Sequence, residues 1–532
     1  MVSLSSLGLT LTPIAVIIWM LVVKRKAADV SGIVGWVVVS IIAFVFFKTS
    51  LEVIFKSTIA GGIKSFPVSL VVASSLLQMA YMERAGALKR IIILIKTIAS
   101  ENKAVQIMLI NIGFGTLMVS VGATPVSLLP PIMLALGYST YVSIAVPAIG
   151  YDALCTYALL GAPIVVFVDV ANSFLGVGHE IGLSEAGSVF FMFLPVISTL
   201  IGFCMLWIVG RWQGIKDGWI PCLLTGVVIT FVSFFTNKVD RLVVLTGVMC
   251  GTAVIIAMVC YLIATGKKVI DKSRLTSEEL DYERSFPLWK ALTPWGLLII
   301  LILALNIPTD MFDLLYRQLT LPIMGLTADG SPIMTRALWN AYTWIFVSTF
   351  LSMFFIKPTT TQLKDTFSLW WKRAPRPVFA VAIFFSIGEV MNMSGYDIAT
   401  EKFAVVSMVQ VLADYSTQVF GNAYGSVVAF IGLLGGFITG SEASTIAMFA
   451  NYTMKTATML DLGLQGMLII TAGLAFGGGL ASVISPSKLQ NAAASIDKLG
   501  EESKVIRIAF VFALLLTSVT AVLAVVLLGI YT

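Results

Sequence analysis

Charged side chains are scarce in this chain. Lys, Arg, Asp and Glu make up 12% of its 532 residues, about half the share of an ordinary soluble domain. A soluble chain of this length would divide into several domains with polar surfaces. Instead, 58% of the residues are hydrophobic, and apolar stretches of about 20 residues, which cross roughly 30 Å of hydrocarbon, recur from end to end. The composition predicts an all-α polytopic membrane protein.

Histidine is almost absent, and no cysteines show a paired spacing. His179 is the only histidine, which excludes a multi-histidine metal site. The cysteines lie in apolar segments without CxxC spacing, as expected of small buried hydrophobes rather than disulfides or metal ligands. They are Cys155, Cys204, Cys222, Cys250 and Cys260. We therefore expect neither a metal nor a cofactor.

The patterns of several other protein classes are also absent. No run of basic residues interleaved with aromatic ones indicates a nucleic-acid surface. No Gly-rich phosphate loop followed by Lys-Ser or Lys-Thr occurs, so a nucleotide-driven mechanism is not expected. An enzyme would need a nucleophile with a base, or acids with a metal. The chain shows neither pattern, which leaves a membrane-embedded enzyme as a remote alternative.

Basic residues predict how the chain crosses the bilayer. We expect about 12 to 14 transmembrane helices. If the N-terminus is outside, six segments that hold 25 of the 34 Lys and Arg residues fall on the cytoplasmic side. This asymmetry matches the positive-inside pattern. The six segments are 24–26, 83–103, 211–217, 267–290, 357–376 and 488–507.

A mixed-charge segment divides the chain in two. Residues 266–290 carry both acids and bases and are too short for a domain, so we interpret them as a solvated cytoplasmic linker, with regulation as the alternative. Residues 1–265 then form an N-terminal membrane half and residues 291–532 a C-terminal one. The amphipathic stretch 88–99 is typical of a helix at the membrane interface.

Small residues, hydroxyls and prolines gather in three otherwise apolar stretches, 113–131, 435–445 and 477–488. Such stretches predict broken or re-entrant helices, because a helix can begin at a capping hydroxyl followed by a proline or an acid. The expected break residues are Gly122, Pro125, Gly440 and Pro486. A helix that begins inside the membrane directs free N–H groups at an anion. The alternative is that the glycines serve only close helix packing.

Three acids lie inside apolar segments, namely Asp152, Glu389 and Glu442. An ionised carboxylate is costly in lipid, so each should face a cavity or a partner. We interpret Glu442 as the first candidate for a coupling proton, with Asp152 and Glu389 after it; the alternative is a structural hydrogen bond. Lys488 is either a partner for a substrate carboxylate or an ordinary cytoplasmic basic residue.

At these residues the chain resembles the L-lactate permease family, which also carries glycolate. The similarity extends over roughly residues 60 to 510, in order and spacing, and is strongest in the C-terminal third. Its motifs are Gly432 to Thr445 with its Thr-Gly-Ser-Glu, Gly477 to Gly500 with its Ile-Ser-Pro, Asn392 to Gly395, Ala135 to Tyr138, and Gly161 to Ile164. Three positions depart from the family pattern: Met118 to Pro125 lacks the family's acid, Asp152 replaces a neutral polar residue, and Lys488 replaces a small or neutral one.

The resemblance implies a helical secondary transporter with two inverted repeats, in the plasma membrane of a prokaryote. We expect it to move a small monocarboxylate such as L-lactate with H⁺. The expected partners are this organic anion and the bilayer, and assembly with further copies of the chain is left open. The substrate-binding candidates are Thr124, Ser127, Asn392, Ser441, Ser444, Ser485, Ser487 and Lys488. The alternatives are another organic anion, such as a dicarboxylate or sulfonate, and Na⁺ as the coupling ion.

Overall fold

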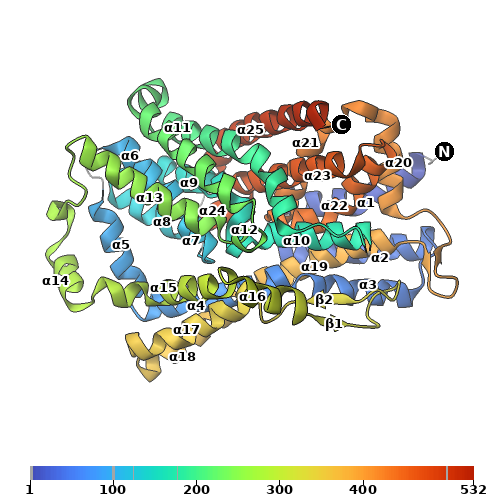
Figure 1. The fold of residues 1–532 in the computed structure, drawn as a ribbon, viewed down its shortest axis with the longest axis horizontal. Coiled ribbons are helices and arrows are strands. Elements are labelled where there is room, and N and C mark those ends of the chain that lie inside the picture. Colours follow the sequence, from blue (N-terminus) through green and yellow to red (C-terminus); the bar gives the residue numbers. More distant parts are fainter. Residues whose placement is uncertain (1–3, 99–101, 124, 177, 499–500, 532) are drawn as a thin grey trace.

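The computed structural model describes residues 4–98, 102–123, 125–176, 178–498 and 501–531. The chain is almost entirely helical, and most helices run along the length of an elongated molecule (Figure 1). Both termini lie at one end, at the right of Figure 1, and the short helix α14 lies at the opposite end.

The first half of the chain holds thirteen numbered α-helices among the described residues. They are α1 (Leu4–Val22), α2 (Ala28–Phe46), α3 (Leu51–Lys64), α4 (Phe66–Arg84), α5 (Ala87–Thr97), α6 (Lys103–Ile107), α7 (Gly115–Ser120), α8 (Pro125–Ala135), α9 (Thr140–Gly150), α10 (Ala158–Leu175), α11 (Leu183–Thr236), α12 (Asp240–Val243) and α13 (Thr246–Ala264). A π-helical segment, η1 (Met108–Phe114), joins α6 to α7, and a 3₁₀ segment, η2 (Tyr151–Tyr157), joins α9 to α10.

The remaining elements begin with the linker. They are η3 (Lys272–Arg274), α14 (Ser277–Ser285), α15 (Leu288–Asn306), α16 (Thr309–Phe312), η4 (Asp313–Gln318), α17 (Ala341–Ile356), α18 (Thr360–Arg373), α19 (Pro375–Met393), α20 (Met408–Phe420), η5 (Gly421–Tyr424), α21 (Gly425–Thr439), α22 (Glu442–Met459), α23 (Gly463–Leu480), η6 (Ala481–Ile484), α24 (Pro486–Ala494) and α25 (Glu502–Tyr531). Antiparallel strands β1 (Leu321–Ile323) and β2 (Ile333–Thr335) form one hairpin, and β3 (Tyr396–Asp397) and β4 (Lys402–Phe403) another.

Twelve segments of the described chain are long and apolar enough to cross a membrane. This confirms the helical membrane architecture, at the lower end of the expected number. The 54-residue α11 is two legs rather than one span, because Arg211 adopts φ 50° and ψ −139° inside it. The legs pack closely, since a Cβ atom on Gly202 would lie 2.6 Å from the Cys222 sulfur. The two small β-hairpins, with strands of two or three residues, were not predicted from the sequence, because so short a pattern does not indicate a strand.

Glycines allow close packing of α21 against α23. A Cβ atom on Gly432 would collide with the carbonyl oxygen of Leu474, and one on Gly436 with that of Gly478. Spaced four residues apart, these glycines let two backbones touch, a common solution where lipid removes the usual hydrophobic drive between helices. The interpretation that glycines serve close helix packing is therefore correct for Gly432 and Gly436, which shortly precede the break at Gly440.

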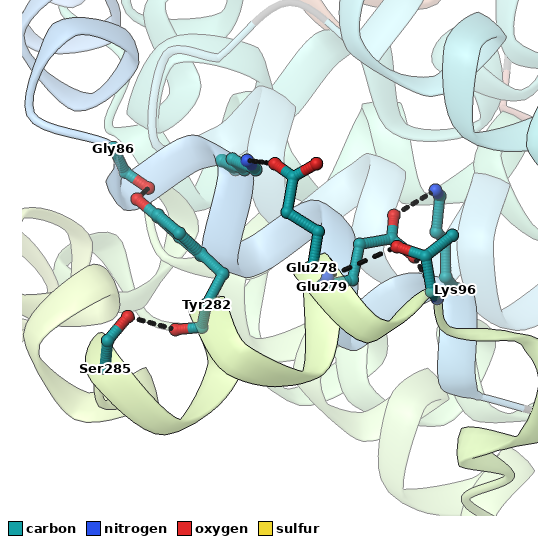
Figure 2. Close-up of polar contacts among 8 residues, drawn as sticks. Gly86, Lys96, Glu278, Glu279, Tyr282 and Ser285 are labelled. Carbon is teal, nitrogen blue, oxygen red and sulfur yellow. Dashed lines mark hydrogen bonds and ion pairs between the residues drawn. The ribbon is translucent and has the colours of Figure 1, made fainter.

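The linker contains an ordered helix, α14, which lies on the surface with none of its residues buried. Its helix α14 starts with a capping box, in which Thr276 and Glu279 bond reciprocally to each other's backbone N–H groups. It lies on α5, where Lys96 Nζ is 2.5 Å from Glu279 Oε1 and the Tyr282 hydroxyl donates to the Gly86 carbonyl (Figure 2). Lys89 pairs with Glu278 at 2.9 Å and Arg90 with Glu283 at 3.0 Å. We call these α5–α14 contacts the linker clamp.

The helix α5 differs from its prediction in its surroundings. The stretch is helical, as expected, but its apolar side chains Ile91, Ile93 and Ile95 are buried inside the protein. It packs against α4, α8, α14 and α15. The amphipathic pattern arises because the polar face meets the linker clamp while the apolar face meets membrane helices.

Candidate functional site

Helices are interrupted in each half where glycine, hydroxyl and proline meet. In the first half α7 ends at Ser120 and α8 begins at Pro125, with Gly122 between them at φ 91°. This left-handed conformation favours glycine. Thr124 lies outside the described residues, and so does the Ser127 side chain, although its backbone belongs to α8.

The second half has two such interruptions. Gly440, at φ 69°, ends α21, and Ser441 then caps α22 by accepting a hydrogen bond from the Ser444 N–H at 3.3 Å. Further on, α23 ends at Leu480 and the short η6 leads to α24, which has Ser485 at its N-cap position and Pro486 in its first turn. The side chains of Pro486 and Ser487 are outside the described part of the structure.

A further interruption lies between α9 and α10. Leu154 leaves the helical region, and Leu159, Leu160 and Gly161 all have positive φ. Two consecutive leucines in this region are strained, which only a well-packed surrounding can hold. Sequence analysis did not identify this break, although Pro147 and Pro163 on either side were a usable signal.

These interruptions bring together six side chains that are distant in sequence. They are Tyr151, Asp152, Cys155 and Thr156 from η2, Glu442 from α22, and Lys488 from α24. We call them the polar cluster. The Thr156 hydroxyl donates to Glu442 Oε1 at 2.8 Å, and the Cys155 thiol contacts the same carboxyl group. The cluster therefore joins the two halves of the chain at their broken helices.

Charge is concentrated in the polar cluster. Glu442 interacts electrostatically with both Asp152 and Lys488, and the Lys488 ammonium lies 4.1 Å from the centre of the Tyr151 ring. A cation over an aromatic face is attracted by the negative charge of that face. Asp152 of the first half and Lys488 of the second thus interact electrostatically in one place.

The two acids and the threonine of the cluster are buried, whereas Tyr151 and Lys488 are half-buried. The exposed fraction is 3% for Glu442, 7% for Asp152 and 2% for Thr156. Glu442 Oε2 is buried and has no N–H or O–H donor among the described residues. The Ser444 hydroxyl is buried as well and has no hydrogen-bond partner among them. A buried carboxyl oxygen without a donor is costly as long as the group is ionised.

Gly479 on α23 sets the space around this oxygen. A Cβ atom at this position would lie 2.8 Å from Glu442 Oε2 and 3.6 Å from the Cys155 Cβ. The Gly-Gly-Gly run before η6 therefore has a second role besides helix packing, since it leaves room beside the carboxyl group.

Two of the sequence candidates lie in other contacts. Glu389 on α19 forms an ion pair with Lys64 of α3, with 2.7 Å between Oε1 and Nζ. Asn392, one turn further along α19, is half-buried, with its amide nitrogen 4.0 Å from the Met393 sulfur. The remaining candidates of the second half, Ser441, Ser444, Ser485 and Lys488, lie at the starts of α22 and α24.

The second-half helices that carry cluster residues, α22 and α24, each pack against a helix of the first half. α10 packs against α22, and α8 packs against α24. In each pair one helix comes from the first half and one from the second, and each of the four starts at or contains a break. Cys155, Thr156 and Tyr151 were not identified from the sequence, because a single thiol, hydroxyl or phenol in an apolar segment carries no pattern of its own.

Comparison with known proteins gives a consistent picture. Residues 6–531 match the model of a family described as L-lactate permease. The chain is 22% identical over 558 residues to the glycolate permease GlcA of Escherichia coli, covering 96% of this chain and 94% of that protein. It is 21% identical to the L-lactate permeases of Salmonella typhi and Bacillus subtilis, covering 91% and 93% of this chain and 88% and 91% of theirs.

One solved structure is weakly similar. It is the YdaH transporter of Alcanivorax borkumensis, with a TM-score of 0.44 and 12% sequence identity, over 89% of this chain and 88% of that one. At this score the likeness supports no detail of the fold or the site.

Proposed function

Since the chain belongs to the L-lactate permease family, and is thus a multi-pass membrane transporter rather than an enzyme, we propose that it moves a small monocarboxylate, L-lactate or glycolate, in symport with H⁺. The names of its relatives support this substrate class, because they include both L-lactate permeases and a glycolate permease. Their identity of 21–22% leaves the choice between the two substrates to experiment.

The observation that carries the proton is the environment of Glu442. It is an acid at a helix break, buried, and in contact with η2 of the other half through Thr156. One of its oxygens has no N–H or O–H donor among the described residues. A carboxyl group in this position binds a proton readily, because its ionised form is high in free energy there. Glu442 is the first coupling residue in this proposal, Asp152 the second, and Glu389 the third.

The substrate carboxylate binds at the helix starts around the cluster. The N-termini of α8, α22 and α24 present backbone N–H groups without helical partners, which suit an anion. The side chains assigned to the substrate are Thr124, Ser127, Asn392, Ser441, Ser444, Ser485, Ser487 and Lys488. The breaks at Gly122, Pro125, Gly440 and Pro486 provide the irregular backbone that such a site requires.

Transport follows from alternating access between the two membrane halves, 1–265 and 291–532, as inverted repeats with the linker 266–290 on the cytoplasmic side. The pairing of α8 with α24 and of α10 with α22 supports the two-half arrangement. The position of both termini at the end opposite α14 supports an outside N-terminus (Figure 1).

The decisive experiment is uptake of radiolabelled L-lactate and glycolate into proteoliposomes with an imposed inward pH gradient. Accumulation that a protonophore abolishes supports the proposal. Uptake that requires Na⁺ and ignores the pH gradient contradicts the coupling ion, and no uptake of either acid by folded protein contradicts the substrate.

A dicarboxylate is the second candidate substrate, and Lys488 is the observation that favours it. A lysine in the cluster offers a second positive centre beside the helix N-termini. Competition by succinate against labelled L-lactate separates the two, because a dicarboxylate transporter would prefer succinate.

A further inference from the structure

Lys488 lies where the two halves of the chain meet. Lys488 belongs to the second half, but α24 packs against α8 and α9 of the first half. Its ammonium group rests on the Tyr151 ring and interacts electrostatically with Asp152 and Glu442. Lys488 thus interacts electrostatically with one acid from each half.

The charges of these three groups do not balance when all are ionised. One lysine and two acids leave one excess negative charge in a buried place. An entering carboxylate would add a second, and like charges at short range in a low dielectric are strongly unfavourable. An anion can therefore bind only if one of the acids becomes neutral at the same time.

The geometry distinguishes the two acids. Glu442 Oε1 accepts a hydrogen bond from the Thr156 hydroxyl at 2.8 Å, whereas Oε2 has no N–H or O–H donor among the described residues and packs against Gly479. Asp152 follows Tyr151 directly in the chain, so the ring and the acid reach Lys488 from the same turn of η2. Glu442 is the acid with an oxygen ready for a proton, and Asp152 helps to hold the lysine.

We propose that Lys488 is the exchange point of coupled transport, where the carboxylate of Glu442 and the carboxylate of the transported anion alternate as its counter-ion. While Glu442 is ionised, its carboxylate balances the charge of Lys488, with which it interacts electrostatically. When the anion enters, Glu442 takes up H⁺ from the solution on the open side: an O–H bond of a hydronium ion breaks, leaving water, and an O–H bond forms at Oε2. The anion then replaces Glu442 beside the lysine.

The charge of the cluster is the same before and after this step. One negative charge enters with the substrate, and one proton removes a negative charge from Glu442. On the other side of the membrane the anion and the proton leave together. The inference rests on the proposed function and specifies it: the substrate class is the monocarboxylates, with one proton for each anion and no net movement of charge. A dicarboxylate would leave one charge unbalanced.

The other titratable groups around Glu442 do not change this balance. Those that face it are Tyr151, Cys155 and Tyr157 of the first half, besides Asp152 and Lys488. On the neighbouring helices, Glu389 of α19 is paired with Lys64, and Asp414 of α20 accepts a hydrogen bond from Gln410. The phenols and the thiol are uncharged at neutral pH.

The test measures binding and protons in the same experiment. Titration calorimetry of the purified protein with L-lactate, glycolate and acetate, repeated in buffers of different ionisation enthalpy, gives the protons taken up for each anion bound. We expect about one proton for each anion at a pH where Glu442 is ionised in the empty site. Lys488→Gln should weaken binding by about tenfold or more, since a charge-assisted partner is lost, and Lys488→Arg should restore most of it.

Lys455→Gln is the matched control. Lys455 is also a half-buried lysine next to this helix system, but it lies thirteen residues after Glu442 on α22, about 20 Å along the helix. We expect its binding and its proton count to equal those of the unmodified protein.

The outcomes separate this inference from the proposed function. If the folded protein binds none of the three acids, the proposed function fails and the inference fails with it. If it binds them without proton uptake, or if Lys488→Gln binds as tightly as Lys455→Gln, the inference is overturned while the function stands. If Lys488→Gln does not fold, the proton count of the unmodified protein and the Lys488→Arg variant still decide. A membrane potential that drives uptake into proteoliposomes without a pH gradient would also overturn it.

Discussion

The two oxygen atoms of the Glu442 carboxyl group have different surroundings. Oε1 is held by the Thr156 hydroxyl, and Oε2 is buried without an N–H or O–H donor among the described residues. The remaining partner that the carboxyl group has is the Cys155 thiol, a weak donor. We interpret this buried and weakly satisfied acid as one that changes its protonation state during transport.

Glu442→Gln tests this at the residue scale. Glutamine keeps the size of the side chain and an oxygen that accepts from Thr156, but it cannot titrate. We expect uptake by cells that express this variant to lose its pH dependence. Undiminished proton-driven uptake would remove the assignment.

Glu389→Gln is the comparison for that variant. Because Glu389 is engaged by Lys64 at 2.7 Å, the substitution should lower the melting temperature by breaking the ion pair. Since Glu389 is only the third candidate for the coupling proton, we expect it to change the pH dependence of the remaining uptake less than Glu442→Gln does. If this variant instead loses the pH dependence, the coupling residue is on α19.

Gly479 provides an independent test of the space beside Oε2. Its substitution by alanine brings a Cβ atom to 2.8 Å from this oxygen, while the helical backbone of α23 prefers alanine over glycine by about 1 kcal/mol. We expect Gly479→Ala to fold and to lose most of its uptake. Gly296→Ala is the matched control, because Gly296 is also helical and a Cβ atom there meets nothing within 4 Å. Equal uptake by the two variants would show that the space is not used.

At the scale of secondary-structure elements, the linker clamp connects the loop between the halves to the site. α14 holds α5 through ion pairs, and α5 packs against α8, whose N-terminus begins at the first-half break (Figure 2). The contacts are outside the apolar segments, so salt and pH reach them directly.

The pKa of Glu279 gives the clamp a defined pH dependence. Burial raises the pKa of this group, but hydrogen bonds from Lys96 and from Thr276 together lower the pKa by more than burial raises it. The net shift of the pKa is therefore downward. The ionised form therefore favours docking of α14. This stabilisation is present above the ordinary pKa of a glutamate and is lost as the pH falls through the lowered one.

We expect hydrogen exchange in residues 277–285 to accelerate on acidification and at high salt. Glu279→Gln should exchange fast already at neutral pH and should respond less to acid. Lys89→Gln is the control, because Lys89 and Glu278 are largely exposed, at 49% and 83%, and such pairs contribute little. Exchange that does not depend on pH in the unmodified protein would contradict the role of Glu279.

At the scale of the whole molecule, ion pairs also join the halves away from the clamp. Arg336, just before α17, pairs with Asp169 of α10 at 2.8 Å, and its guanidinium lies 4.5 Å from the Tyr316 ring. Arg317 of η4 reaches Asp240 of α12 at 3.4 Å. Such pairs must open or rearrange if the halves move against each other.

A double-mutant cycle measures the first of these pairs. We expect Arg336→Gln and Asp169→Asn each to lower the melting temperature, and the double variant to lower it by less than the sum, with a coupling of about 1 kcal/mol. The control is Lys56 and Glu52, an exposed pair within α3, where the coupling should be near zero. Additive effects at Arg336 and Asp169 would mean that the pair does not hold the halves together.

Much of this architecture was predictable from the sequence because its signals are local. The breaks at Ser441 and at Ser485-Pro486 follow from capping hydroxyls, glycine and proline within a few residues. The helical membrane class follows from composition alone.

The parts that could not be predicted depend on distant contacts. Thr156 belongs to the site only because it donates a hydrogen bond to Glu442, which lies 286 residues later in the chain. Glu389 looked like an unpaired acid because Lys64 stands 325 residues before it. The docking of α14 could not be predicted for the same reason, since the bases that pair with it lie on α5.

The separation of Thr156 and Glu442 has a consequence for how the protein is made. A ribosome that adds about 5–20 residues each second needs roughly 15–60 s to travel the 286 residues between them. During that time the strained turn at Leu159 and Leu160 and the acid at Asp152 are inserted without the helix that later covers them. The insertion machinery or early neighbouring helices must shelter this turn, and a chain truncated after the linker would present it to membrane quality control as an unfinished product.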